Sequence, residues 1–162
     1  MKLHALLYYL LFTLLVLISC KEESTSKLES QADTSEQLGQ IHLEVTGHAD
    51  AQPFFKKGLL LLHSFEFDDA EDAFDEALAI DSTFVMAIWG KAMTHNHPLW
   101  REQETETARE AMSLLGDTPE ERLTKVKTEL EKDLWQAIEV LYGPDGEKKE
   151  RDIAYNLSLI HI

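Results

Sequence analysis

The chain has 162 residues, of which 44% are hydrophobic, with few Gly and Pro residues. This composition suits one acidic and largely helical domain. The formal net charge of −15 repels like-charged phosphates, so nucleic acid is not an expected partner. Cys20 is the single cysteine, so no disulfide can form within the chain.

The amino end is typical of a secreted bacterial protein. Lys2 precedes an apolar run at residues 5–18, which is too short to cross a bilayer core of ~30 Å comfortably as a helix. The residues Leu17-Ile18-Ser19-Cys20 resemble a bacterial lipobox, in which the cysteine is acylated and becomes the first residue of the mature chain. We therefore expect a lipoprotein signal peptide at residues 1–19 and lipidation of Cys20. The alternative is a plain signal peptide with an incidental cysteine.

Residues 20–48 are expected to form a flexible tether. Residues 21–40 hold few large apolar side chains and no periodic stripe, so they bury too little surface to offset the entropy cost of ordering. Residues 21–23 resemble the surface-export signal of some bacterial lipoproteins, although ordinary tether composition explains them equally well. The alternation of apolar and polar residues at 41–45 is compatible with a short extended piece or equally with a loop, and we expect it to be a lead-in that packs on the first helix pair.

Two helices, at about 51–65 and 68–79, are predicted to pack as a hairpin. Apolar and small residues recur at helical spacing in both arms, with a polar turn between them. Asp50 is the expected N-cap of the first arm, with Pro53 in its first turn. Gly58 costs roughly 1 kcal/mol relative to Ala inside a helix, so we expect a partner helix to approach it closely.

A third helix is predicted over residues 83–94. It repeats the use of small residues at Gly90, which follows Gly58 by 32 residues and so comes near a 34-residue repeat period. A long loop then runs from His95 to Trp100, because Pro98 cannot continue the helix.

The remaining chain is predicted to contain three more helices. The first spans about 102–115, and the second is a single helix of about twenty residues that ends near Leu141. The third begins near Glu147. Residues 157–162 are apolar, although the end of a helical repeat array needs a polar cap. We interpret this atypical tail as foreign sequence at the end of a truncated reading frame.

The motifs together resemble a known family. The sequence FxxGLLLLHSFxFDDAxxAFxxALxID, followed by AIWGKAMTHNHPLW, resembles a group of bacterial secreted or lipid-anchored tetratricopeptide-repeat (TPR) proteins, over about residues 38–156. The chain departs from the usual repeat by having Ser82 where Pro is common, and residues 83–85 ahead of Met86. The resemblance implies an all-α domain at residues 49–156, built as a TPR-like α-solenoid of antiparallel helix pairs with scaffolding duties. It implies no enzymatic activity.

The concave face of such a solenoid is lined mainly by the first helix of each pair. The residues expected to contact a partner there are Phe55, Leu59, Leu62, His63, Ala87, Lys91 and Thr94.

Three histidines suggest an alternative function. His63 at the end of one helix could join His95 and His97 of the loop in a metal site, because these helix ends lie on the same side of a repeat stack. No fourth ligand is apparent, and the other interpretation is that the histidines cap a helix and shape the turn.

Two further features of the sequence bear on function, namely the position of Trp100 and the absence of known catalytic motifs. Trp100 is expected to fill the gap between the third and fourth helices, and an exposed platform for carbohydrate or peptide is the alternative. The sequence shows no phosphate-binding glycine loop, zinc-protease motif or nucleophile elbow, so neither an enzyme nor a cofactor is expected.

The leading hypothesis is a lipid-anchored envelope scaffold, in the outer membrane or facing the periplasm, with surface exposure left open. Its partner is a protein or peptide of unknown identity, and metal handling is the alternative.

Overall fold

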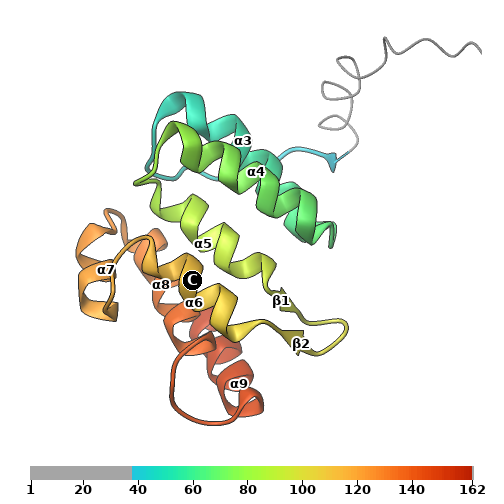
Figure 1. Ribbon diagram of the computed structural model, residues 1–162, viewed down its shortest axis with the longest axis vertical. Coiled ribbons are helices and arrows are strands. Elements are labelled where there is room, and N and C mark those ends of the chain that lie inside the picture. The colour runs from blue at the N-terminus through green and yellow to red at the C-terminus, as the bar shows by residue number, and fades with distance from the viewer. Residues whose placement is uncertain (1–37, 162) are drawn as a thin grey trace, which may run out of the picture. The chain divides into compact units, whose positions relative to one another are not determined.

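The computed structural model describes residues 38–161, and these residues are mainly α-helical (Figure 1). They contain seven α-helices and one short β-hairpin, which confirms the expected all-α class. The residues from Leu38 onward form one compact unit. The predicted signal peptide at residues 1–19, Cys20 and most of the tether lie outside the described residues.

The helices and strands follow one another closely along the chain. They are η1 (Ala49–Ala51), α3 (Gln52–His63), α4 (Phe67–Ile80), α5 (Val85–Thr94), β1 (Asn96–His97), β2 (Glu102–Gln103), α6 (Thr105–Ser113), α7 (Pro119–Lys125), α8 (Glu129–Leu141), α9 (Lys148–Ser158) and η2 (Leu159–His161).

Helices α3 and α4 form the predicted hairpin, and one aromatic ring fixes how closely they pack. A Cβ atom added at Gly58 of α3 would lie 2.7 Å from the ring of Phe74 in α4, and one added at Gly90 of α5 would lie 2.4 Å from the same ring. Both distances are too short for real atoms. Helices α3 and α5 can therefore approach the ring of Phe74 this closely only because each has a glycine at the point of contact. The predicted close approach at Gly58 is confirmed, and its cause is a phenylalanine.

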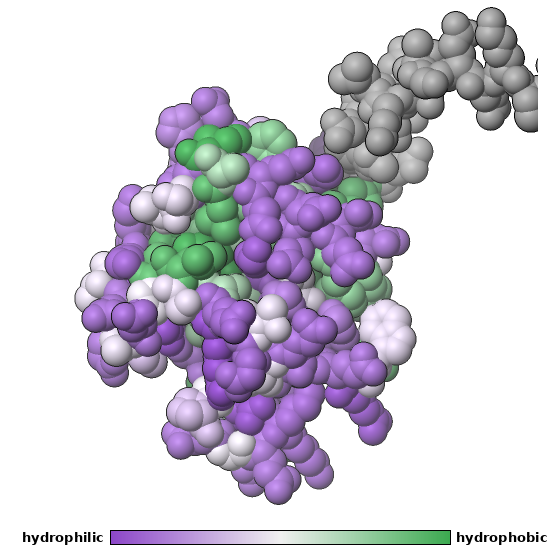
Figure 2. Space-filling model, in the orientation of Figure 1, coloured by the Kyte–Doolittle hydropathy of each residue, from purple (hydrophilic) through white to green (hydrophobic). Residues whose placement is uncertain are grey.

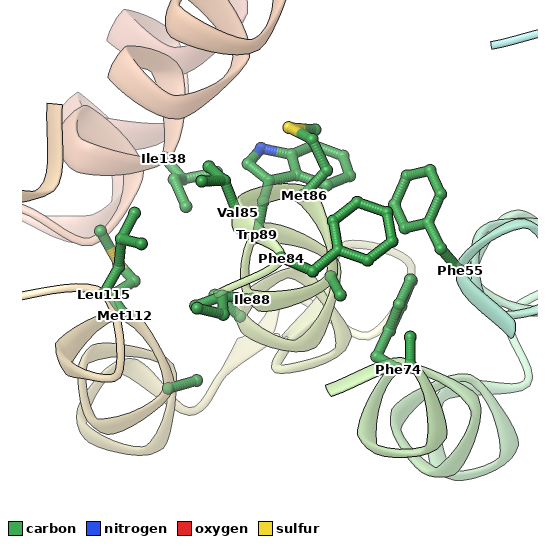
Figure 3. Packing of buried hydrophobic residues seen from close by; sticks show 14 of the residues in the cluster. Phe55, Phe74, Phe84, Val85, Met86, Ile88, Trp89, Met112, Leu115 and Ile138 are labelled. Atoms are coloured by element: carbon green, nitrogen blue, oxygen red, sulfur yellow. The ribbon is translucent and has the colours of Figure 1, made fainter. Parts of the chain in front are cut away.

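Helix α5 lies at the centre of the hydrophobic core. Eight of its ten residues are buried, which is the pattern of a helix surrounded by other elements. Figure 3 shows side chains of α5 between Phe55 and Phe74 on one side and Met112, Leu115 and Ile138 on the other. The indole N–H of Trp89 also donates to the carbonyl of Leu134 in α8, at 3.1 Å.

The helix start expected at Asp50 differs from the structure. Residues 49–51 form the 3₁₀ turn η1, whose cap is the imidazole of His48, and α3 starts with Ala51 as its N-cap. Pro53 lies in the first turn of α3, as predicted.

The single long helix predicted up to Leu141 is wrong, because the structure divides it into α7 and α8. Val126 is extended, with φ −78° and ψ 130°, and Thr128 then starts α8 with a capping box to Glu131. The carboxylate of Glu131 is fully buried and also accepts the backbone N–H and the hydroxyl of Thr46. A polar cap inside an unbroken apolar stripe thus ends one helix and begins another.

Two arginines satisfy the carbonyl groups at the end of α8. Arg109 of α6 donates to the carbonyls of Tyr142 and Gly143, at 2.8 and 2.9 Å. Arg151 of α9 donates to the carbonyl of Leu141 at 3.0 Å and to the side chain of Gln103 in β2 at 3.3 Å. The end of α8 is therefore connected to α6, to α9 and, through Arg151, to the hairpin.

The boundaries of the folded unit are wider than predicted. Ile41, Leu43 and Val45 are partly buried and pack against the core, as expected of the lead-in, so this segment belongs to the folded unit and not to a free tether. At the other end α9 continues to Ser158, past the predicted domain end at residue 156.

Candidate functional site

The loop predicted between the third and fourth helices is a β-hairpin. Asn96 pairs with Gln103 and His97 with Glu102, which displaces the start of α6 from the expected residue 102 to Thr105. The four residues 98–101 form the tip. The N–H of Trp100 donates to the carbonyl of His97 at 3.2 Å, as in hairpin loops built around a tight turn.

The base of the hairpin is held by two histidines. His95 is only 6% exposed, and its Nδ1 lies 3.1 Å from a carboxylate oxygen of Glu104. The backbone N–H of Glu104 donates to the carbonyl of His95 at 2.9 Å, which closes the base. The Nε2 atom of His97 lies 2.9 Å from the carbonyl of Thr94, so this ring nitrogen donates to the end of α5. Both imidazoles therefore fix where the tip of the hairpin projects.

The hairpin and the α3–α4 turn bring four aromatic rings together. The ring of Phe67 lies 4.4 Å from that of His97 and 6.2 Å from those of Phe65 and Trp100, measured between centroids. His97 and Trp100 are 6.4 Å apart in an edge-to-face arrangement. These spacings are typical of favourable aromatic pairs. We call Phe65, Phe67, His97 and Trp100 the aromatic cluster.

Much of this apolar surface faces solvent. Trp100 is 58% exposed, Leu99 beside it is 65% exposed and Phe65 is 47% exposed. Phe65 also has φ +65°, a left-handed conformation that costs a residue other than glycine about 1–3 kcal/mol. Exposed Trp and Phe side chains grouped on two adjoining loops are typical of a binding surface rather than of a core.

A pocket of about 290 Å³ opens beside the cluster. The residues that line it are Phe65, Glu66, Phe67, Asp68, Asp69 and His97. This set combines aromatic rings with three carboxylates and one imidazole, and it includes no thiol or hydroxyl nucleophile. Figure 2 shows mostly hydrophilic surface on the visible face, with a larger hydrophobic patch left of centre and a smaller one toward the right. The pocket is suited to binding an apolar or positively charged group.

The expected concave partner surface is largely wrong. The structure buries Phe55, Leu59, Ala87 and Thr94 completely or almost completely, so none of these side chains can meet a partner. Their helical spacing reflects packing against neighbouring helices, because these side chains lie on the core-facing side of α3 and α5. Sequence periodicity alone does not separate these two cases.

The other three predicted contact residues have different surroundings. Leu62 is partly buried against the core, and His63 is exposed at the end of α3. Lys91 donates to both oxygens of Asp75 at 2.7 Å and lies 3.3 Å from Glu71. Burial acts to lower the pKa of its amine, but the two carboxylates outweigh burial and raise this pKa. Lys91 therefore joins α5 to α4.

The three histidines do not form the predicted metal site in the described part of the chain. Within residues 38–161 no three His, Cys, Asp or Glu side chains are grouped so that they could hold a metal ion. One ring nitrogen of His95 is used by Glu104, and one of His97 is used by the carbonyl of Thr94. The alternative interpretation, in which these residues shape the turn, describes their contacts in the structure.

The prediction that Trp100 fills the gap between the third and fourth helices is also wrong, and the alternative of a platform for carbohydrate or peptide stays a prediction. Trp100 does not fill a gap between helices but stands at the hairpin tip. Phe65 was missed altogether. The available signals were the aromatic residues on both sides of Glu66, at 65 and 67, and the Pro98-Leu99-Trp100 sequence, because connecting loops run over the protein surface.

No helix within residues 38–161 is long and apolar enough to cross a membrane. Comparison of the chain with protein-family models, with curated proteins and with solved structures found no match.

Proposed function

We propose that the chain is a lipid-anchored TPR-like scaffold of the bacterial cell envelope, and that it binds a protein or peptide through its hairpin. The repeat assignment is supported by the successive helix pairs α3–α4 and α5–α6 and by the glycines that let them approach. In this proposal the pairs stack as a solenoid, with α8 and α9 as the third pair. The role is binding and not catalysis.

One observation carries the binding function. The aromatic cluster, with Leu99, exposes large apolar side chains that contribute little to the core, at a position fixed by hydrogen bonds from His95 and His97. A rigid base under an exposed Trp reduces the entropy lost on binding. The partner surface therefore lies at the hairpin and the α3–α4 turn, and not on the buried residues first expected.

The anchor is proposed from the lipobox-like residues 17–20. The thioether-linked and amide-linked acyl chains of such an anchor would insert into one leaflet, and each buried CH₂ contributes about 0.8 kcal/mol. The acidic chain would not be held by anionic lipid headgroups, so the acyl chains would provide the attachment.

Photo-crosslinking in the native cells tests the binding proposal. A benzoyl-phenylalanine at position 99 is expected to capture a discrete partner, because Leu99 stands at the exposed tip. A matched control places the same group at Leu114, which is 59% exposed at the end of α6. Equal capture from both positions, or none from position 99, would refute the hairpin as the binding surface.

A second variant distinguishes specific binding from non-specific crosslinking. Trp100→Ala, combined with the crosslinker at position 99, is expected to reduce capture at least tenfold while the protein level stays the same. Unchanged capture would show that the aromatic cluster does not hold the partner.

A further inference from the structure

We propose that the pocket beside the aromatic cluster binds a positively charged side chain of the partner, and that it prefers arginine to lysine. This inference rests on the proposed function, because it names the chemical group that the partner inserts. The pocket combines the volume of one side chain with aromatic rings and carboxylates in its lining.

The pocket has the size for one side chain. Its volume of about 290 Å³ lies just below the roughly 300–1,000 Å³ of pockets that enclose whole drug-sized ligands. Phe65, Phe67 and His97 contribute rings to its wall. A cation over the face of an aromatic ring gains about 0.5–2 kcal/mol, the larger value when water is excluded.

The carboxylates of the pocket are available to a ligand. Glu66, Asp68 and Asp69 line it, and none of the three takes part in an ion pair within residues 38–161. Glu71 and Asp75 further along α4 differ from them, because both are paired with Lys91. The acidic first turn of α4 thus places three unpaired negative charges beside aromatic rings, and the basic Arg101 of the hairpin is not among the residues that line the pocket.

Arginine fits this combination better than lysine does. Its planar guanidinium can stack on a ring while its N–H groups point outward to carboxylates, and it is less strongly hydrated than an ammonium group. Leu99 and Trp100 would contact apolar residues next to that arginine. The partner segment is therefore expected to be basic, with an arginine flanked by apolar side chains.

Peptide titration tests the preference on the unaltered protein. The probes are acetyl-Gly-Gly-Xaa-Gly-Gly-amide peptides in which the central residue is Arg, Lys, Gln or Glu. The full chain is kept in a non-ionic detergent, because a choline headgroup would itself compete for an aromatic pocket. Chemical shifts of the backbone amides at residues 65–69 and of the indole of Trp100 report binding.

The expected order of affinity is Arg, then Lys, then Gln, with Glu the weakest. Arg should bind at least tenfold more tightly than Gln, and raising the salt from 50 to 500 mM should reduce that difference. Gln binding as tightly as Arg, or shifts confined to residues outside the pocket, would overturn the proposal.

A matched pair of variants locates the effect. Asp68→Asn with Asp69→Asn removes two charges from the pocket, whereas Asp72→Asn with Glu76→Gln removes two exposed charges from the same helix outside it. The first pair is expected to lose about tenfold in affinity for the Arg peptide, and the second less than twofold. Circular dichroism and thermal melting check that both variants are folded, and equal losses would contradict the pocket.

Failure here can be told apart from failure of the proposed function. If Arg and Gln peptides bind equally but position 99 still crosslinks to a partner in a Trp100-dependent way, the cation preference is wrong and the binding surface stands. If the crosslink is also missing, both the cation preference and the proposed binding surface are wrong.

Discussion

Single residues fix how the helices pack, and Phe74 is the clearest case. Its ring lies against Gly58 and Gly90, which come from two different helices. A buried phenylalanine ring cannot move away as the end of a flexible side chain can, so an added methyl group at either glycine has no space.

We therefore expect Gly90→Ala to lower the free energy of unfolding by about 1–3 kcal/mol, the usual cost of overpacking a core. Urea denaturation measures this loss. Adding Phe74→Leu makes room for the methyl group, so the double variant should lose less than the sum of the two single losses. Strict additivity would show that the two positions do not compete for space.

Asp81 provides a pH-dependent contribution at the end of α4. Partial burial of its carboxylate acts to raise its pKa, but hydrogen bonds from the hydroxyl and N–H of Thr83 and from the N–H of His48, together with the nearby His48 ring, outweigh this and hold the pKa below 3.8. The folded pKa lies below the unfolded value. The stabilisation is therefore present above the unfolded pKa and is lost as the pH falls through the folded one.

Asp81→Asn should consequently melt at a lower temperature than the wild type at pH 7, and the difference should close as the pH falls below about 3.8. Thermal melting between pH 2 and 7 measures it. Asp72→Asn on the exposed face of α4 serves as the control and should show no such closing difference. A gap that stays constant down to pH 2 would count against the assigned hydrogen bonds.

Among the larger elements, the hairpin exposes Trp100, for which we propose a binding role, whereas the tryptophans of α5 and α8 pack in the core. Trp100 is mostly exposed, whereas Trp135 of α8 is fully buried and donates to Glu139 at 2.9 Å. Trp135→Ala is expected to cost about 3–5 kcal/mol of the free energy of unfolding. Trp100→Ala should cost less than about 1 kcal/mol while reducing partner binding. Denaturant titration of both variants would reveal a structural Trp100 by a large loss.

The break between α7 and α8 depends on the cap at Thr128. Its hydroxyl accepts the N–H of Glu131 at 3.2 Å, so Thr128→Ala should lower the free energy of unfolding by about 1 kcal/mol and speed amide exchange in the first turn of α8. Thr124→Ala, on the exposed side of α7, is the matched change without a cap. Similar losses in both variants would mean that the cap is not what starts α8.

At the scale of the whole molecule, the proposed anchor determines where the protein is found. Cys20→Ser should move the protein from the membrane fraction to the soluble fraction and abolish labelling by radioactive palmitate. The net charge of −15 offers no attraction to anionic lipid that could replace the acyl chains. Membrane retention of the serine variant in high salt would contradict a lipid anchor.

Local patterns predicted much of the fold, because helix pairs are encoded by nearby residues. The spacing around Gly58 and Gly90 indicated which helices approach one another, and both glycines lie against a neighbouring helix. The break before Thr128 was missed although the local capping box of Thr128 with Glu131 marks a helix start; what the local pattern does not contain is the contact of Glu131 with Thr46, 85 residues away. Distant contacts of this kind leave no periodic trace in the sequence.

The candidate site was less predictable than the fold for a related reason. A tryptophan after a proline can fill a core or stand in solvent, and the hairpin pairing together with the contacts of His95 and His97 places Trp100 at the exposed tip. The residues expected to contact a partner had the same ambiguity. Phe55 and Ala87 show the same helical spacing whether they face a neighbouring helix or a partner. Burial is decided by elements elsewhere in the chain, and therefore not by the local pattern.

The bond from Arg151 to Gln103 restricts how this sequence can diverge. Arg151 belongs to α9, yet it supports a strand that comes 48 residues earlier, in the hairpin that we propose as the binding surface. A replacement at either position alone removes support from the hairpin, whereas a joint replacement by another donor and acceptor preserves it. In proteins that share ancestry with this one, positions 103 and 151 are therefore expected to vary together.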